Sequence, residues 1–201
     1  MTGELWSRCQ FVVVDVEGNG ASPQEIVEVA VVHVRRGRLA TERHWMVRPE
    51  TPITPQATRL HGITNQDVDD RPSFAGIAPD LLAELGSTPV VGHHVGVDAG
   101  LLRRQLPGWR PETCIDTLRL AKHALPGASD YGLQALYRSV VGGEESTAHR
   151  APEDARMTAR LFLSLASRLG QEMHLDLLAL ARIGASSEDP LLKAQQGRLF
   201  S

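Results

Sequence analysis

Short apolar runs separated by turn residues fill the first quarter of the chain. The run from Phe11 to Val16 is mostly β-branched and leads to Gly18, which predicts a strand that ends in a turn. Similar runs at 26–34 and 39–47, joined by turn residues 35–38, predict two more strands after a loose N-terminus of eight residues. Three strands joined by short turns predict an antiparallel β-meander.

Helical spacing dominates the rest of the chain. Thr54 followed by Pro55 is typical of a helix start, and Thr64 with Asp67 resembles a capping pair. Helices are predicted at 55–60, just after 64, up to 85, from 98, from 116, at 131–141, from 152 and beyond 171, with brief strands at 89–91 and 114–115 and a loop at 92–98. This order predicts an α/β domain whose mixed sheet begins antiparallel and is flanked by helices.

The first strand carries two carboxylates at its end. Alternate residues of a strand face the same side, so Asp15 and Glu17 lie together while Val14 and Val16 face a core. Neighbouring carboxylates repel each other unless one binds a proton or a cation lies between them. Oxygen ligands suit Mg²⁺ or Mn²⁺. The alternative is a pair of acids on a half-exposed strand.

Three later residues join this pattern, and each also has an ordinary structural explanation. Asp98 precedes an apolar helical run, where an acid commonly caps the helix. Asp154 lies in the first turn of a predicted helix, where the helix dipole favours a carboxylate. His149, five residues earlier, is on its own an ordinary surface histidine.

Composition narrows the class of protein. A hydrophobic fraction of 42% over 201 residues is ordinary for one globular domain. The net charge of −3 gives no general attraction for nucleic acid, so phosphate contacts have to be local or metal-assisted. Two cysteines are too few for a disulfide framework. With no apolar run long enough for a membrane span, we expect a cytoplasmic protein with no membrane partner.

Taken together, Asp15-x-Glu17, Asp98 after His93-His94, and His149 before Asp154 resemble the DEDD-type 3′–5′ exonucleases with a catalytic histidine. Members include the proofreading subunit of bacterial DNA polymerase III, RNase T and oligoribonuclease. The resemblance runs from about residue 11 to 169 and takes in segments 60–64 and 115–118. It implies a ribonuclease H-like fold, with an exonuclease domain at 1–170 and a C-terminal helix and polar tail at 171–201.

The resemblance also implies a two-metal hydrolysis. Two Mg²⁺ or Mn²⁺ ions, about 3.5–4 Å apart, clamp the attacking and leaving oxygens. By resemblance Asp15 bridges the ions, Glu17 and Asp154 complete one site, and Asp98 holds the other directly or through water. His149 is the general base, and Glu17 counts among the catalytic residues as well as the ligands.

Residues around the terminal nucleotide depart from the family. Gly18-Asn19 replaces a Thr-Thr pair, His94 replaces Asn, and Val97 replaces an aromatic residue that would stack on a base. These changes bear on substrate preference. The expected substrate-binding set is Gly18, Asn19, Gly20, His61, His93, His94 and Val97. The alternative for Gly18 and Gly20 is a tight turn, and for His61 it is an ordinary position in a surface loop. Contacts to the phosphate backbone are a further possibility for Arg103, Arg104 and Arg110, and the alternative is that these arginines lie on a solvated face.

The last residues resemble a peptide by which bacterial replication and repair proteins bind the sliding clamp. Gln196, Leu199 and Phe200 form a Gln-x-x-Leu-Phe pattern on a polar tail. A frayed end that folds back on the core is the alternative. The tail favours DNA over RNA as substrate, in repair or proofreading.

We therefore expect a metal-dependent 3′–5′ exonuclease that releases 5′-mononucleotides from single-stranded or frayed DNA ends. An RNA-trimming or oligoribonucleotide-degrading enzyme is the first alternative, and a non-catalytic clamp-associated subunit is the second. The sequence leaves the oligomeric state open.

Overall fold

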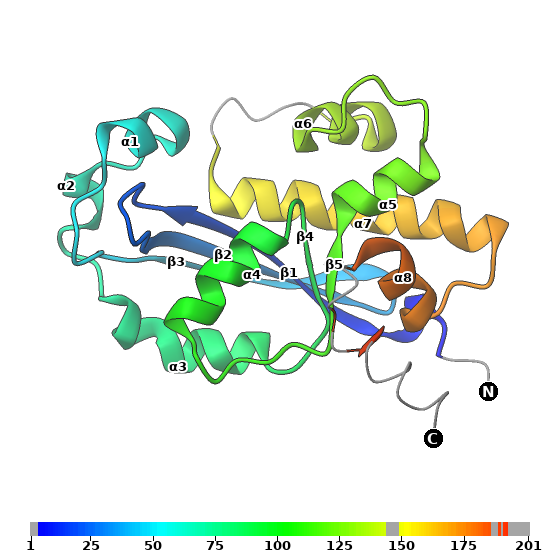
Figure 1. Ribbon diagram of the computed structural model, residues 1–201, viewed down its shortest axis with the longest axis horizontal. Coiled ribbons are helices and arrows are strands. Elements are labelled where there is room, and N and C mark those ends of the chain that lie inside the picture. The colour runs from blue at the N-terminus through cyan, green and yellow to red at the C-terminus, as the bar shows by residue number, and fades with distance from the viewer. Residues whose placement is uncertain (1–3, 144–148, 186–188, 190, 193–201) are drawn as a thin grey trace.

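The computed structural model describes residues 4–143, 149–185, 189, 191 and 192. Within these ranges, five strands form one mixed sheet in the order β3-β2-β1-β4-β5 (Figure 1). The strands are β1 (Gln10–Gly18), β2 (Ile26–Arg35), β3 (Arg38–Met46), β4 (Val90–Gly92) and β5 (Cys114–Asp116). β1–β3 form the antiparallel meander, whereas β4 and β5 continue the sheet in parallel. The predicted α/β class and mixed sheet are confirmed.

Helices cover both faces of the sheet (Figure 1). They are η1 (Trp6–Arg8), α1 (Pro55–His61), α2 (Asn65–Val68), α3 (Phe74–Leu85), α4 (Gly96–Gln105), α5 (Thr117–Ala124), α6 (Leu133–Leu136), the π-helix η2 (Tyr137–Val141), α7 (Ala151–Glu172) and α8 (Leu177–Gly184). Thr54 caps α1, and Thr64 with Asp67 forms a capping box on α2, as predicted.

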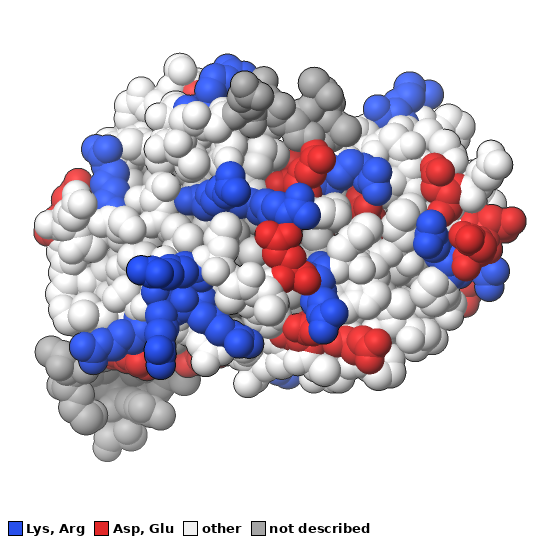
Figure 2. Space-filling model, turned by 180° about the vertical axis from the view of Figure 1, so that it is seen from behind, with Lys and Arg blue, Asp and Glu red and all other residues white. Residues whose placement is uncertain are grey.

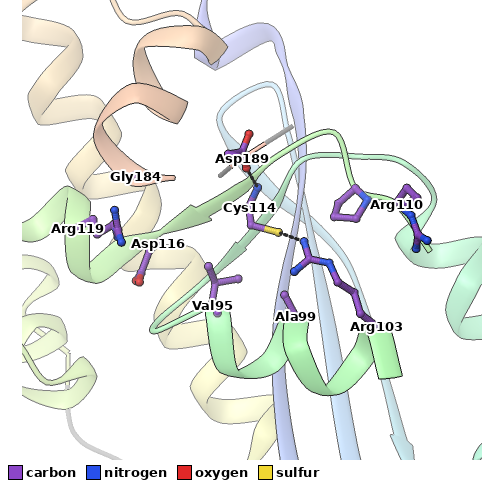
Figure 3. A pocket seen from close by; sticks show the side chains of 11 residues that line it. Val95, Ala99, Arg103, Arg110, Cys114, Asp116, Arg119, Gly184 and Asp189 are labelled. Carbon is purple, nitrogen blue, oxygen red and sulfur yellow. Dashed lines mark hydrogen bonds between the residues drawn. The ribbon is translucent and has the colours of Figure 1, made fainter. Parts of the chain in front are cut away.

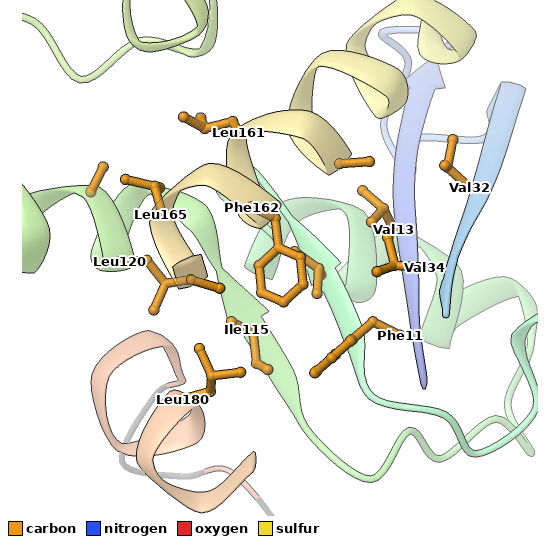
Figure 4. Close-up of a cluster of buried hydrophobic side chains, with 14 of the residues drawn as sticks. Phe11, Val13, Val32, Val34, Ile115, Leu120, Leu161, Phe162, Leu165 and Leu180 are labelled. Carbon is orange, nitrogen blue, oxygen red and sulfur yellow. The ribbon is translucent and has the colours of Figure 1, made fainter. Parts of the chain in front are cut away.

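The two faces of β1 belong to two separate apolar cores, because its side chains alternate. Phe11 and Val13 face α7, where the Phe11 and Phe162 rings meet edge to face at 4.9 Å (Figure 4). Val12 and Val14 face α3 and α4. The same alternation places Asp15 and Glu17 on the α7 side, one and two steps beyond Val13 on that face. The predicted division between acids and core valines is confirmed.

Three sequence expectations about elements are wrong. The N-terminus is not loose from residue 4, because Trp6 is buried and its N–H donates to Leu175 O at 3.0 Å. α4 begins at Gly96 and not at Asp98. The helix predicted at 131–141 begins only at Leu133 and widens into η2. Each difference arises from tertiary contacts, which a periodicity does not contain.

Beyond α7, the described residues pack on the core. Leu175 and Leu180 join the cluster that includes Leu120, and Gly184 lies close against Ile115. The division at residue 170 stays a prediction. The tail residues Gln196, Leu199 and Phe200 lie outside the described residues. In the described part of the chain, no helix is long and apolar enough to cross a membrane.

Candidate active site

Asp15, Glu17 and Asp154 come together where β1 ends and α7 begins. One carboxylate oxygen from each lies within 4.8 Å of the other two. Asp98 joins them from α4, because its Oδ1 accepts a hydrogen bond from Val16 N, between Asp15 and Glu17, at 3.1 Å. This contact replaces the helix-cap role considered for Asp98. The fold therefore brings all four predicted acids together, although the first and the last are more than 130 positions apart in the chain.

Burial and mutual repulsion hold protons on this cluster when no cation is bound. Burial, followed by the charges of Asp98, Asp154 and Glu17, raises the pKa of Asp15 well above its usual range. Burial and the charge of Asp154 raise the pKa of Glu17 to about 8. Burial raises the pKa of Asp98 to about 7, against hydrogen bonds from its own backbone and from Val16 N. Burial also raises the pKa of Asp154.

The donor set fits a divalent cation. Asp154 Oδ1 is buried and has no hydrogen-bond partner among the described residues. Hard carboxylate oxygens are the ligands that Mg²⁺ and Mn²⁺ prefer. A cation between the acids would satisfy this oxygen and offset the repulsion that, after burial, contributes to the raised pKa values.

His149 stands at the edge of the acid cluster. It lies two residues before α7, and its Nδ1 is 3.5 Å from Asp154 Oδ2. Its side chain is 52% exposed. The imidazole is therefore next to the carboxylates and open to water, as a general base for a water molecule has to be.

Glu28 is a fifth acid beside the cluster, and it lies directly opposite Glu17 in the β1–β2 ladder. It is fully buried, yet Arg150, Ala151 N and His44 all donate to its carboxylate. Burial acts to raise its pKa, but these hydrogen bonds outweigh burial and lower the pKa to about 2. The sequence signal for Glu28 is an acid between Val27 and Val29 in an apolar strand, where a buried charge needs a partner.

The structure corrects the expected role of Asn19. Its side chain is fully buried and bonds within the loop after β1: Nδ2 donates to Thr51 O at 3.0 Å, and Oδ1 accepts from Glu25 N at 3.0 Å. Asn19 therefore holds this loop and has no side-chain group left for a nucleotide. Contacts within the chain also explain why glycine stands at the two positions beside Asn19. A side chain at Gly18 would collide with Gln24, and one at Gly20, which has φ +72°, would collide with Thr54.

His61 is also buried, contrary to both alternatives considered for it. Nδ1 accepts from Ile63 N at 3.0 Å, so Nε2 carries the proton and donates to Gly18 O at 3.2 Å. Burial lowers its pKa, which suits this neutral form. His61 therefore fixes the end of β1 against the α1–α2 segment and has no free nitrogen for a base.

The remaining predicted substrate residues lie around the start of α4. His93 Nδ1 is 2.9 Å from Thr117 Oγ1, and burial lowers its pKa. His94 has φ +59° and donates its backbone N–H to Asp116, which also caps α5 as expected. Val97 is 71% exposed and next to Asp98 in the chain. Substrate contacts by these residues stay a prediction.

Arg103 and Arg110 line a separate cavity of about 460 Å³ between α4, β5 and α8 (Figure 3). Arg103 donates to Cys114 Sγ, and Arg110 donates to the carbonyls of Pro107 and Trp109. On the opposite face of the molecule, basic and acidic side chains are interspersed, with basic ones gathered towards one end (Figure 2). The face in Figure 2 is not uniformly basic, in agreement with the net charge of −3.

Carboxylates that cluster at the end of a strand suit a divalent cation, and nucleases are among the hydrolases that use such metal sites. Residues 12–162 match the family model described as exonuclease, of the RNase T type. This match covers well over half of the chain. The chain belongs to this exonuclease family.

Several relatives are named as DNA polymerase III or one of its subunits. DNA polymerase III subunit epsilon of Aquifex aeolicus is 30% identical over 167 residues, which are 79% of this chain and 81% of that protein. The PolC-type DNA polymerase III of Thermotoga petrophila is 34% identical over 161 residues, which are 76% of this chain but only 12% of that protein. The chain thus spans a small part of PolC.

A solved structure supports the same fold. Exonuclease X, in complex with 5′ overhanging duplex DNA, superposes with a TM-score of 0.68 and 32% identity over 86% of this chain and 98% of that one.

We expect the metal-free protein to lose stability as pH rises. Glu17 and Asp98, with folded-state pKa values of about 8 and 7, hold protons that the unfolded chain releases near pH 4. The folded state binds more protons between these limits, so the free energy of unfolding falls from pH 5 to pH 8. Calorimetry in EDTA should show a higher Tm at pH 5.

The matched variant is Asp15→Asn, which removes a carboxyl group whose pKa lies well above its usual range. At pH 8 in EDTA, it should raise Tm by about 2–4 °C per kcal/mol of repulsion removed. Mg²⁺ should raise the Tm of the natural protein and leave that of Asp15→Asn nearly unchanged. A Tm in EDTA that is lower at pH 5 than at pH 8 would contradict the expectation that the folded acid cluster holds protons.

Proposed function

We propose that this protein is a metal-dependent 3′–5′ exonuclease of the type with four acids and a catalytic histidine. The observation that carries the proposal is the meeting of Asp15, Glu17 and Asp154 oxygens within 4.8 Å, with His149 at the edge. A binding module has no need for clustered carboxylates that repel phosphate. Membership of the exonuclease family supports the same reaction class.

The four acids have the ligand chemistry for two divalent cations. Asp15, Glu17 and Asp154 would hold one, and Asp15 with Asp98 the other. When bound, such ions supply Lewis-acid stabilisation of the charge that develops on the phosphodiester. Either Mg²⁺ or Mn²⁺ suits these oxygens.

The residues around the cluster have defined tasks in this proposal. His149 takes the proton from the attacking water, and Asp154 stabilises the imidazolium that forms, because its carboxylate lies 3.5 Å from Nδ1. The water oxygen bonds to phosphorus as the bond from phosphorus to the 3′ oxygen breaks, the 3′ oxygen takes up a proton from solvent, and a 5′-mononucleotide leaves. Val97, which is 71% exposed beside Asp98, offers the terminal base an apolar contact in place of an aromatic one.

DNA is the proposed substrate, at single-stranded or frayed 3′ ends in repair or proofreading. Support comes from relatives that are named as DNA polymerase III components and from exonuclease X, whose structure contains a 5′ overhanging duplex. The clamp-binding role of the tail, through Gln196, Leu199 and Phe200, and a cytoplasmic location also stay predictions.

The test is digestion of matched 5′-labelled single-stranded DNA and RNA, with Mg²⁺, Mn²⁺ or EDTA, resolved as product ladders. We expect a 3′-shortening ladder on DNA that EDTA abolishes. A ladder on RNA alone would keep the mechanism and replace DNA by RNA as substrate. No ladder on either polymer with either metal would refute the exonuclease and favour the clamp-associated binding subunit.

A further inference from the structure

Glu28 lies beside the acid cluster and connects β2, β3 and the start of α7 through hydrogen bonds. Its carboxylate is fully buried in β2. His44 Nε2, from β3, lies 2.8 Å from Oε1. Arg150 donates from Nε to Oε2 at 3.0 Å and from Nη2 to Oε1, and Ala151 N donates to Oε2 at 3.0 Å. Charge-assisted, two-pronged contacts of this kind are strong and geometrically specific.

Glu28 differs from its neighbour Glu17 because an arginine forms an ion pair with it. The two residues are partners in the β1–β2 ladder, where like charges destabilise a sheet. Arg150 neutralises Glu28 by direct contact, whereas Glu17 contributes to the group of three acids that can hold a cation. Arg150 thereby separates a structural carboxylate from the metal-binding ones.

The contacts of Glu28 fall at the start of α7. Ala151 is its first residue, and Arg150, at the N-cap position, makes no side-chain cap of its own. The Ala151 N–H is one of the amides that a helix leaves unpaired at its N-terminus, and Glu28 satisfies it. His149 comes directly before these two residues. Asp154 follows within the first turn and donates its N–H to Arg150 O at 3.0 Å.

We propose that the Glu28–Arg150 pair is a positioning clamp for the active site. It fixes the first turn of α7 against β2 and so sets the distance of His149 and Asp154 from Asp15 and Glu17. Neither member touches the reacting atoms. This inference rests on the proposed function for its kinetic consequence, but its effect on α7 does not depend on activity.

Arg150→Ala is the direct test, and Arg156→Ala is its matched control. Arg156 also ties α7 to the sheet, since its Nε donates to Glu42 Oε2 at 2.6 Å, but it lies a turn and a half further along the helix. Arg150→Ala should reduce kcat about 10–100-fold, as loss of residues behind metal ligands does, with KM within about twofold. Arg156→Ala should keep natural kcat.

Three further measurements separate positioning from general stability. Free guanidinium at millimolar concentration should restore part of the kcat of Arg150→Ala, and Arg150→Lys should retain more activity than Ala. In metal-free protein, amide exchange at Ala151, Glu153 and Asp154 should be faster in Arg150→Ala than in Arg156→Ala. The exchange measurement needs no catalysis and applies even if the natural protein proves inactive.

The outcomes are distinct. Inactivity of the natural protein on every substrate refutes the proposed function and leaves the exchange measurement to decide the clamp. Equal kcat and equal exchange in Arg150→Ala and Arg156→Ala refute the clamp while the exonuclease stands. The test changes Arg150 and not Glu28, because the Arg150 side chain is 36% exposed whereas that of Glu28 is fully buried.

Discussion

Asp15→Asn is expected to reduce kcat about a thousandfold or more on single-stranded DNA with Mg²⁺. The carboxylate lies at the centre of the cluster, where the charges of Asp98, Asp154 and Glu17 all act on it. Asparagine has the same shape but lacks the negative charge that a bridging ligand supplies. Stabilisation by a bound cation amounts to several kcal/mol, and each 1.4 kcal/mol corresponds to about a tenfold change in rate.

Single-turnover kinetics with saturating enzyme measures this loss free of product release. Glu153→Gln is the matched control, because it removes an exposed carboxylate from the same turn of α7 as Asp154. The control should keep nearly natural kcat. Folding of Asp15→Asn is checked by its Tm in EDTA, which should equal or exceed that of the natural protein. Near-natural turnover in a folded Asp15→Asn would remove Asp15 from the metal-binding set.

His149→Ala is expected to lower kcat about 10²–10⁴-fold, the range attributed to general acid–base catalysis. The imidazole is the only basic nitrogen group that the sequence pattern assigns to the reaction, and it lies 3.5 Å from Asp154 Oδ2. Removing a ring that is 52% exposed leaves the apolar cores intact. Mg²⁺ should therefore still raise the Tm of His149→Ala, in contrast to Asp15→Asn.

The control is His123→Ala, which removes an exposed histidine near the end of α5, away from the acids. Rates are measured from pH 5.5 to 9 on the same oligonucleotide. His149→Ala should lose rate at every pH at which the natural protein is active, while His123→Ala follows the natural profile. If His149→Ala equals the control, another group takes the proton from water.

Local residue choices predicted the elements that carry the site. The β-branched run before Asp15 predicted β1, and the period of two placed Asp15 and Glu17 together on the face opposite Val14. Thr54 and Thr64 predicted the starts of α1 and α2, which the structure confirms. These predictions succeed because strand alternation and helix capping depend on residues within a few positions of one another.

Substrate-binding predictions were less successful, because they depend on which polar groups are already bonded. The resemblance to the exonuclease family assigned Asn19 and His61 to the nucleotide. In the fold, both are buried and fully hydrogen-bonded within the chain. A sequence position beside a site does not reveal whether a side chain faces the ligand or the loop behind it.

By itself the sequence determined the α/β class and the order of the elements, and its resemblance to the exonucleases predicted four acids and a histidine for the site. Only the tertiary structure brought these residues together and showed that Glu28, the ladder partner of Glu17, is bonded within the chain. Arg150 binds Glu28 and is 122 residues away in the chain, so no local pattern records that contact. Burial makes such distant contacts necessary, because a charge in the interior is stable only when a partner from another element reaches it.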